Sequence, residues 1–362
     1  MINVTKSIMP EFQKYIHNIQ KLWETRWLSN NGEFLLKLEK SLEERFQTNC
    51  VLVNNGTLGL LISLELFGFP ANSEIITTPF SFIATSSSIL WQKYKPVFVD
   101  IDISSLNIDP KKIVGKITSK TVAIMPVHVF GNPCEIEEIQ YIAEKFNLKV
   151  IYDAAHCFDI CYEGKSIYKF GDVSVASFHA TKVFHTIEGG AIFSDNKSLI
   201  DKAKKLRNFG FNEKIEIEEV GINAKMNEFQ AIMGLLNLEV VDEEISLRKE
   251  IYELYLEELK GTNVSFQKKS EKITKYNYIY LPVIFENENI RNKIFDVLKE
   301  KGINARKYFY PSLNELRFCE DYKGECPVSS LISRRILQLP LYGELKKEEV
   351  LRICKIIREN LD

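Results

Sequence analysis

The sequence predicts an α/β fold in which a mostly parallel sheet lies between helices, followed by a smaller α+β domain. Short apolar runs alternate with helical stretches from residue 50 to residue 153, which is the pattern of strand–helix–strand units. Two further apolar runs, at 172–178 and 190–194, extend the expected sheet. Polar residues follow several of these runs directly. Sheets of this kind bind ligands at the carboxyl ends of their strands, so the sequence also predicts where a site would lie.

Two amphipathic helices are expected before the sheet, at 9–26 and 33–48, with Asn31-Gly32 between them. In the second, EFLLKLEKSLEERF spaces its apolar residues by three and four, as the buried face of a helix requires. The strands that begin the sheet are expected at the runs CVLV, EIITT, PVFVD, VAIMPV and KVIYD. The helices that connect them are expected at 57–68, 81–93, 110–117 and 135–146.

A long helical region from about 225 to 260 leads into a less regular pattern. The elements expected there are a strand at 277–285, a helix at 288–300, segments at 303–309 and 335–339, and a last helix near 346–358. We therefore divide the chain into a large domain, residues 1–245, and a small domain, residues 246–362. The N-terminal helix could pack on either.

Composition narrows the function classes. The 362 residues carry a formal net charge of −2, so no basic excess marks a nucleic-acid-binding protein. No apolar run approaches the ~18 residues that a membrane span needs, and the first residues lack the apolar core of a signal peptide. Seven scattered cysteines, an odd number, are typical of reduced thiols. We expect a cytoplasmic protein without nucleic-acid or membrane partners.

A zinc site is a weak alternative for Cys157 and Cys161 with the neighbouring His156. Structural zinc usually has four ligands in two close pairs, and the second pair is missing from the sequence. We expect no metal.

The residues richest in chemistry are Asp153, at the end of an apolar run, and Lys182, just beyond a later one. Pyridoxal phosphate needs this combination: an amine that binds it covalently, and a carboxylate that keeps its pyridine nitrogen protonated. An isolated pair would more simply be a helix-capping aspartate and a surface lysine. The surrounding residues must therefore decide.

Three further features favour the cofactor. Asn54-Asn55-Gly56-Thr57 lies between a strand and a helix, where backbone N–H groups can bind a phosphate. Ser177 could add a hydroxyl donor, although it could also be an ordinary strand residue. Phe82 follows another strand and could stack on a pyridine ring, or could belong to the core.

This combination resembles the DegT/DnrJ/EryC1/StrS family of sugar aminotransferases from about residue 27 to the C-terminus. The most specific match is SFHATKVFHTIEGG at 177–190, supported by DAAH at 153–156 and GINAKMNE at 221–228. The resemblance implies the aspartate-aminotransferase type of fold, with pyridoxal 5′-phosphate as cofactor. Relatives that act as dehydratases replace the lysine by histidine, so Lys182 argues against that branch.

Site residues follow from the resemblance position by position. It implies that Lys182 is the catalytic lysine that binds the cofactor covalently. The residues implied to bind the cofactor noncovalently are Asp153 at the pyridine nitrogen, His156 near the 3-hydroxyl, Phe82 on the ring, and Gly56, Thr57 and Ser177 at the phosphate. Asn223 matches a residue that reaches the phosphate from the partner subunit. The resemblance therefore implies a homodimer with shared active sites.

For the substrate, the resemblance implies a nucleotide-linked keto sugar, with L-glutamate as amino donor, in surface-glycan biosynthesis. The SFHATK variant is most similar to members that aminate C4 of dTDP-4-keto-6-deoxyglucose, giving dTDP-4-amino-4,6-dideoxyglucose. Candidate substrate contacts are Asn30, His179, His185 and Glu188.

Alternatives remain open. They are a C3-directed or other nucleotide-sugar aminotransferase, a decarboxylase or C–S lyase of the same fold, and a non-catalytic binding or regulatory protein. An unrelated nucleotide-binding protein is disfavoured, because the sequence has neither G-x-G-x-x-G nor a Walker-type run.

Overall fold

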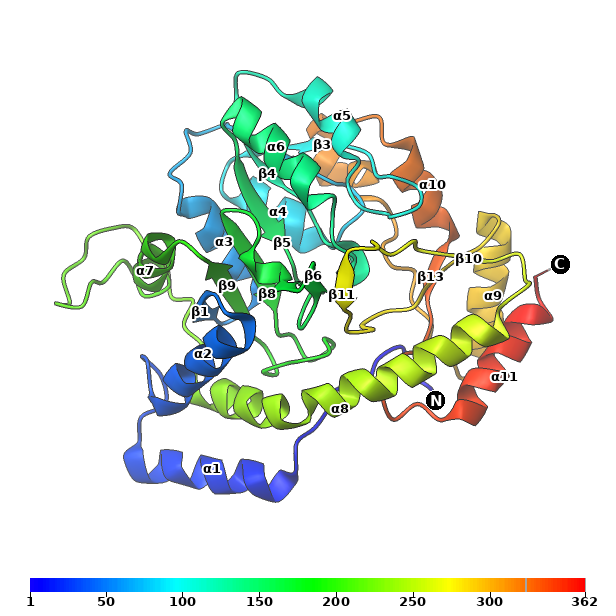
Figure 1. Ribbon diagram of the computed structural model, residues 1–362, viewed down its shortest axis with the longest axis horizontal. Helices are drawn as coiled ribbons and strands as arrows, with labels where there is room; N and C mark the ends of the chain where they lie inside the picture. Colours follow the sequence, from blue (N-terminus) through cyan, green and yellow to red (C-terminus); the bar gives the residue numbers. More distant parts are fainter. Residues whose placement is uncertain (323, 362) are drawn as a thin grey trace.

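The structure is a computed structural model that describes residues 1–322 and 324–361, and a seven-stranded sheet forms its centre (Figure 1). In spatial order the strands are β1 (Asn49–Val53), β9 (Gly190–Ser194), β8 (Val173–Ser177), β5 (Lys149–Asp153), β4 (Thr121–Met125), β2 (Glu74–Thr77) and β3 (Lys95–Phe98). The pairs β8–β5, β5–β4, β4–β2 and β2–β3 are parallel, whereas β9 runs antiparallel to both β1 and β8. The predicted mostly parallel sheet is confirmed.

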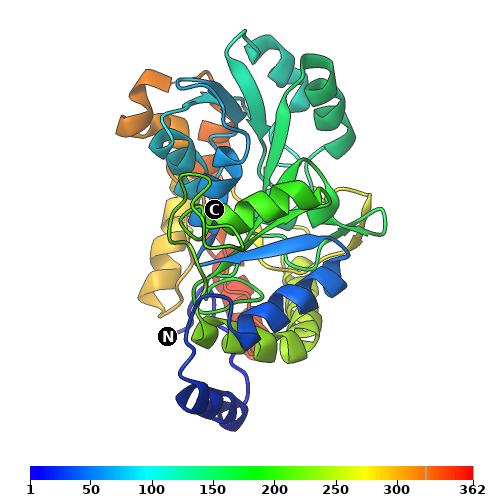
Figure 2. The same ribbon diagram turned by 90° about the vertical axis from the view of Figure 1, so that its left-hand side faces the viewer.

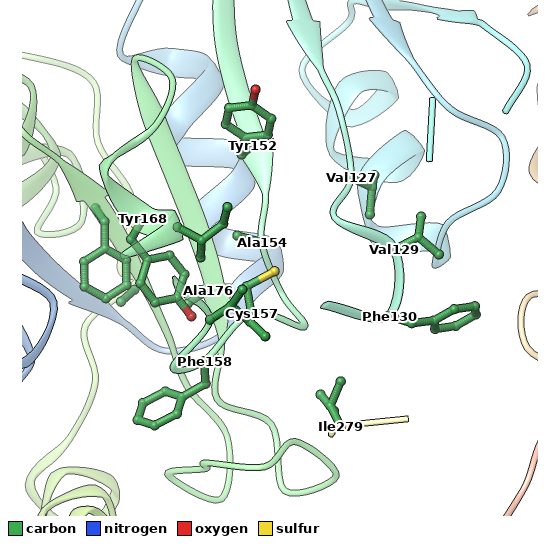
Figure 3. Close-up of a cluster of buried hydrophobic side chains, with 14 of the residues drawn as sticks. Val127, Val129, Phe130, Tyr152, Ala154, Cys157, Phe158, Tyr168, Ala176 and Ile279 are labelled. Carbon is green, nitrogen blue, oxygen red and sulfur yellow. The ribbon is translucent and has the colours of Figure 1, made fainter. Parts of the chain in front are cut away.

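Apolar side chains alternate between the two faces of this sheet because successive strand residues point in opposite directions. Val51 and Val53 of β1 belong to one core, and Cys50 and Leu52 belong to the other. The first core is covered by α3 (Gly56–Glu65), α4 (Ile83–Trp91) and α7 (Lys197–Leu206). The opposite core is covered by α2 (Glu33–Phe46), α6 (Ile136–Phe146) and the first part of α8 (Glu228–Glu258). Figure 3 shows part of this second core beside the sheet, around Tyr152, Ala176 and Phe158.

A third apolar cluster forms the core of the C-terminal region. It packs the end of α8 against α9 (Glu288–Glu300), α11 (Lys347–Arg358) and a three-stranded sheet. That sheet has the order β10 (Ser265–Phe266), β12 (Pro282–Ile284) and β13 (Ile336–Gln338). Other elements include α5 (Pro110–Ile113), α10 (Pro327–Arg335), and the small sheet of β11 (Ile273–Lys275), β6 (Cys161–Tyr162) and β7 (Lys165–Ser166).

Helix α8 joins the two regions. It is continuous through residue 245, so the helix itself does not mark the expected boundary between residues 1–245 and 246–362, which stays a prediction. The first helix, α1 (Phe12–Thr25), packs on the beginning of α8, where the Tyr15 hydroxyl donates a hydrogen bond to the Phe229 carbonyl at 3.3 Å. Figures 1 and 2 show α1 at the outer edge of the molecule. The residues before α1 reach the other region, since Ile2 belongs to the C-terminal core.

Most predicted elements lie within a few residues of the observed ones, and the differences have physical reasons. The strand expected at 277–285 is confined to Pro282–Ile284, because Tyr276 and Tyr280 pack on the main core instead of pairing. Helix α7 was not predicted, although Asn196 caps it by accepting a hydrogen bond from Ser198 N–H. In the described part of the chain, no helix is both long and apolar enough to cross a membrane.

Candidate active site

A cavity of about 560 Å³ opens at the carboxyl ends of the parallel strands. Strands β5 and β8 end there at Asp153 and Ser177, and α3 begins there just after β1. Because β9 is antiparallel, its first residue, Gly190, lies opposite Ser177 at the same edge. Nine of the sequence-predicted site residues line this cavity: Gly56, Thr57, Phe82, Asp153, His156, Ser177, His179, Lys182 and Glu188.

Asp153 is the buried carboxylate of the site, with 5% of its surface exposed. Its Oδ2 accepts a hydrogen bond from the Thr85 hydroxyl at 2.7 Å, and its Oδ1 accepts one from Ala155 N–H at 3.2 Å. Burial raises the pKa of Asp153, while these two donors and the charge of Lys182 act in the opposite direction. The hydrogen-bond donors that reach Asp153 within the described chain are neutral, so a cationic N–H group from a ligand would stabilise the buried charge.

The N-terminus of α3 provides an anion-binding turn. Asn55 caps the helix by accepting a hydrogen bond from Leu58 N–H at 2.9 Å. The N–H groups of Gly56 and Thr57, in the first turn, have no acceptor within the helix, and both residues line the cavity. Gly190 must lack a side chain here, because a Cβ would lie 2.8 Å from the backbone of Asn55 and Gly56.

Lys182 lies in a compact loop between β8 and β9. The apolar residues of its sequence motif anchor this loop: Phe178, Val183 and Phe184 are fully buried, and the Phe184 ring stacks on Phe158 at 4.3 Å between centroids. Lys182 itself is half-buried and lines the cavity, with its Nζ 5.9 Å from the centroid of the Tyr280 ring. In this motif the apolar residues therefore hold the loop in the core, and polar residues such as Lys182 line the cavity.

His156 is held among aromatic rings beside Lys182. Its ring stacks with Phe130 and Phe309 at interplanar angles of 6° and 8°. Its Nδ1 accepts a hydrogen bond from Phe130 N–H at 3.2 Å, which leaves Nε2 to carry the proton. Burial lowers the pKa of His156 well below its usual value, and the charges of Lys182 and Arg306 lower it further. The imidazole is therefore neutral and can donate one hydrogen bond from Nε2.

His179 and Glu188 face each other at the mouth of the cavity. Their Nε2 and Oε1 atoms are 3.5 Å apart, and both side chains are about half exposed. The Nδ1 atom of His179 lies 2.8 Å from the Thr181 hydroxyl and also accepts a hydrogen bond from Thr181 N–H. Both residues can contact a ligand that enters from solvent.

Among the lining residues that the sequence analysis missed are Arg306 and Tyr308, which come from the C-terminal region. They come from the segment between α9 and β13, so the C-terminal region closes one side of the cavity. The Arg306 guanidinium lies over the Tyr308 ring, 4.3 Å from its centroid. The available signal was an arginine two residues before three successive aromatic residues, Tyr308-Phe309-Tyr310. Arg306 adds a cationic group to the cavity.

Three predicted residues do not line the cavity of their own chain: His185, Asn30 and Asn223. The expectation that His185 contacts substrate is wrong for this cavity, because the side chain is 1% exposed and its nitrogens bind the backbone of Ile8 and Ile187. Asn30 is exposed in the turn before α2. Asn223, expected to act in a partner's site, is also exposed.

The residues at this cavity fit pyridoxal phosphate. An amine, a buried carboxylate with neutral hydrogen-bond donors, an anion-binding helix N-terminus and an aromatic residue converge on one space. When bound, this cofactor supplies an electron sink for the carbanion that forms when a substrate carbon loses a proton.

Comparisons with known proteins agree with this reading. Residues 11–358 match the model of the DegT/DnrJ/EryC1/StrS aminotransferase family. The dTDP-4-amino-4,6-dideoxy-D-glucose transaminase of Shigella dysenteriae is 40% identical over 99% of this chain and 98% of its own length. The enzyme of the same name from Escherichia coli is 37% identical over 98% of both chains.

A solved structure shows the same fold. The crystal structure of DesI in the presence of its TDP-sugar product superposes with a TM-score of 0.92 and 28% identity, covering 99% of this chain and 92% of that one. The chain thus belongs to the DegT/DnrJ/EryC1/StrS aminotransferase family.

Proposed function

We propose that this pyridoxal-phosphate-dependent aminotransferase transfers the amino group of L-glutamate to C4 of dTDP-4-keto-6-deoxyglucose. The observation that carries the proposal is the convergence of Asp153 and Lys182 on one cavity, beside an anion-binding helix N-terminus. The relatives from Shigella dysenteriae and Escherichia coli, which match nearly the whole chain, support the choice of sugar and of C4. The product would be dTDP-4-amino-4,6-dideoxyglucose.

In this proposal six of the cavity residues hold the cofactor noncovalently. Asp153 would bind the pyridine nitrogen, and the neutral His156 would donate from Nε2 to the 3-oxygen. Gly56, Thr57 and Ser177 would bind the phosphate, and Phe82 would stack on the ring. Phe82 is 47% exposed and lies 6.4 Å from the Tyr308 ring, so one of its faces is available to a planar ligand.

Lys182 supplies both the covalent link and the acid–base chemistry. Its Nζ, once released from the cofactor, takes a proton from the α-carbon of glutamate. In the second half-reaction the same atom delivers a proton to the sugar carbon that gains the nitrogen. Because Phe178, Val183 and Phe184 fix the loop on both sides, the amine can reach both substrates from one position.

The groups at the mouth contact substrate. Glu188 can accept hydrogen bonds from sugar hydroxyls, and His179 can donate one to them from Nε2. Arg306 can bind a carboxylate of glutamate or an acidic group of the nucleotide sugar. All three side chains line the same cavity, so one sugar or one amino acid could contact more than one of them.

We also propose that the enzyme is a homodimer with shared sites. The segment from Phe209 to Ile222 carries a set of exposed apolar side chains, which a second subunit would bury. They are Phe209, Ile215, Ile217, Val220 and Ile222, between 40% and 89% exposed. Asn223 follows this segment directly and is exposed, so it is available to the neighbouring cavity.

The proposal is tested by incubating the purified protein with pyridoxal phosphate, L-glutamate and dTDP-4-keto-6-deoxyglucose. Mass spectrometry and NMR of the sugar should show an amino group at C4 and stoichiometric 2-oxoglutarate. Amination of dTDP-3-keto-6-deoxyglucose alone would instead identify a C3-directed enzyme. If glutamate gave no half-reaction with the bound cofactor and neither sugar were aminated, the proposed function would fail.

A further inference from the structure

Residues 2–8 form an extended strap that joins the C-terminal core to the loop of Lys182. At one end, Ile2 N–H donates to the Gly302 carbonyl and Asn304 N–H donates to the Ile2 carbonyl, both at 2.8 Å. At the other end, the Ser7 hydroxyl donates to the Ala180 carbonyl at 2.7 Å, two residues before Lys182. The strap thus connects the region that supplies Arg306 to the loop that supplies the proposed catalytic amine.

His185 makes the second contact between the strap and this loop. Its Nδ1 accepts a hydrogen bond from Ile187 N–H at 3.1 Å, so the ring proton lies on Nε2. That Nε2 is 2.7 Å from the Ile8 carbonyl and donates to it. Burial lowers the pKa of His185, which favours the neutral ring that this arrangement requires. Each ring nitrogen therefore holds a different segment: Nε2 the strap, and Nδ1 the loop.

The loop needs such support at Ile187. Its φ of 71° lies in the left-handed region, which is unfavourable for a β-branched residue. The next carbonyl, that of Glu188, is held from both sides by the Thr186 hydroxyl and the Gln230 amide, each at 2.7 Å. The turn that His185 holds at Ile187 consequently sets where the Glu188 side chain enters the cavity.

The inner side of His185 is fixed as well. Asn237 of α8 donates from Nδ2 to the His185 backbone carbonyl at 2.9 Å. Because the side chain is 1% exposed and lies outside the cavity lining, a direct contact with substrate is excluded for this chain. Asn237 Nδ2 also lies 3.4 Å from the ring Nε2, so α8 supports the ring from the side away from the cavity.

We propose that His185 is a positioning residue, whose imidazole ties the strap to the lysine loop and so sets the placement of Lys182 and Glu188. This inference rests on the proposed function, since it takes Lys182 as the catalytic amine. A loop held at both of its ends presents that amine in one position, whereas a displacement of about 1 Å can lower turnover by about 100-fold.

Two substitutions separate the two nitrogens of His185. Asn places an oxygen near the position of Nδ1, so His185→Asn keeps the acceptor for Ile187 N–H but cannot reach Ile8. Gln places an amide N–H near the position of Nε2, so His185→Gln keeps the donor to Ile8 and loses the acceptor. His185→Ala removes both, and Ser7→Ala weakens the strap without touching the buried ring. His17→Gln, at an exposed position of α1, is the matched control.

Hydrogen exchange of the protein without cofactor gives a readout independent of turnover. We expect faster exchange at the amides of Ile2 and Asn304 in His185→Asn and Ser7→Ala, and at the amide of Ile187 in His185→Gln. His185→Ala should show both effects, and His17→Gln neither. Exchange that rises uniformly over the whole chain would mean that His185 only stabilises the fold.

Kinetics complete the test. His185→Ala should lower kcat by about 10- to 100-fold with KM for glutamate changed less than about threefold, and Asn or Gln should each restore part of the loss. Normal kcat in His185→Ala with the cofactor fully bound would overturn the positioning role alone. A wild-type protein without transaminase activity would overturn the proposed function and this role together, while the exchange pattern would still report the strap.

Discussion

The hydroxyl of Thr85 donates a 2.7 Å hydrogen bond to Oδ2 of Asp153, and its own oxygen lies 2.7 Å from the Ser81 hydroxyl. Helix α4, which carries Thr85, is thereby tied to the carboxylate at the end of β5. The hydrogen bond matters because the Asp153 carboxylate is buried. A buried charge has lost its contacts with water, so its stability depends on the hydrogen-bond donors that the protein supplies.

Thr85→Val should therefore impair cofactor binding, although valine has nearly the same shape as threonine. Burial raises the pKa of Asp153, and the Thr85 hydrogen bond opposes this effect. Loss of the donor should therefore raise the pKa further, so that less of the carboxylate is ionised to bind the pyridine nitrogen. We expect weaker cofactor binding and turnover lowered by about 10-fold, with about 1–3 kcal/mol lost from the free energy of unfolding. Cofactor titration, kcat and urea unfolding measure these effects. Thr85→Ser keeps the hydroxyl and should stay close to wild type; equal losses in both variants would contradict the explanation.

Arg306→Lys should show whether Arg306 acts in substrate binding or in the chemical steps. A guanidinium can hold a carboxylate or phosphate through two parallel hydrogen bonds, whereas an ammonium binds as a point charge. We expect KM for glutamate or for the nucleotide sugar to rise by about 10-fold, with kcat changed much less. Initial rates with each substrate varied in turn identify which one Arg306 binds. Arg352→Lys, on the exposed face of α11, is the control. An unchanged KM for both substrates would remove Arg306 from substrate binding.

His128 should make the fold sensitive to acid. Burial lowers its pKa to about 3, and its Nε2 has no hydrogen-bond partner among the described residues. An unfolded histidine titrates near 6.5. Between these values the unfolded chain binds a proton that the folded chain does not, so the free energy of unfolding falls as pH drops below about 6.5. The loss is up to about 1.4 kcal/mol per pH unit and ends near pH 3.

Urea unfolding from pH 7 to pH 4 measures this slope. His128→Asn keeps an acceptor for Cys134 N–H, which donates to the His128 Nδ1 at 3.0 Å, but cannot be protonated. In this variant the free energy of unfolding should change less steeply with pH than in wild type. The difference in slope should correspond to the uptake of up to one proton on unfolding. Burial also lowers the pKa of His156 and His185, so the remaining slope should keep its sign. An identical slope in His128→Asn would show that His128 is not the acid-sensitive group.

The sequence predicted the sheet well because its strands are buried on both faces. Continuous apolar runs such as the one ending at Asp153 have few alternative explanations, and the polar residue that follows each run marks the binding edge. Arg306 and Tyr308 lay beyond this reasoning, since they approach the cavity from a region with little regular pairing. Their placement depends on how the C-terminal core packs on α8. The local pattern of apolar and polar residues in the sequence does not predict this packing.

His185 shows the opposite limit. In sequence it stands three residues from Lys182 and three from Glu188, so a substrate contact was a natural expectation. The structure turns its ring away from the cavity, because Phe184 and Thr186 on either side of it are buried in the core of the loop. Distance along the chain could not distinguish a residue that contacts the ligand from a buried residue that holds the contacting residues in place.

Subunit mixing tests the proposed shared site. Lys182→Ala should be inactive because it removes the amine, and Asn223→Asp should bind cofactor poorly because its negative charge would repel the phosphate of the neighbouring site. If Asn223 acts across the interface, a mixed dimer has one site with both lesions and one with neither. Mixing the two inactive proteins should then restore up to about a quarter of wild-type activity per subunit, since about half of the dimers are mixed and each has one intact site.

A tagged pull-down must show that subunits exchanged, and Lys182→Ala mixed with itself gives the baseline. Exchange without any return of activity would contradict the shared site, as would an active monomer in sedimentation at assay concentrations. Ile217→Asp provides an independent check, because this exposed side chain belongs to the apolar segment 209–222. A carboxylate there would have to be desolvated at the interface, so the variant should shift toward monomer and lose activity in parallel. A fully active, dimeric Ile217→Asp protein would place the interface elsewhere.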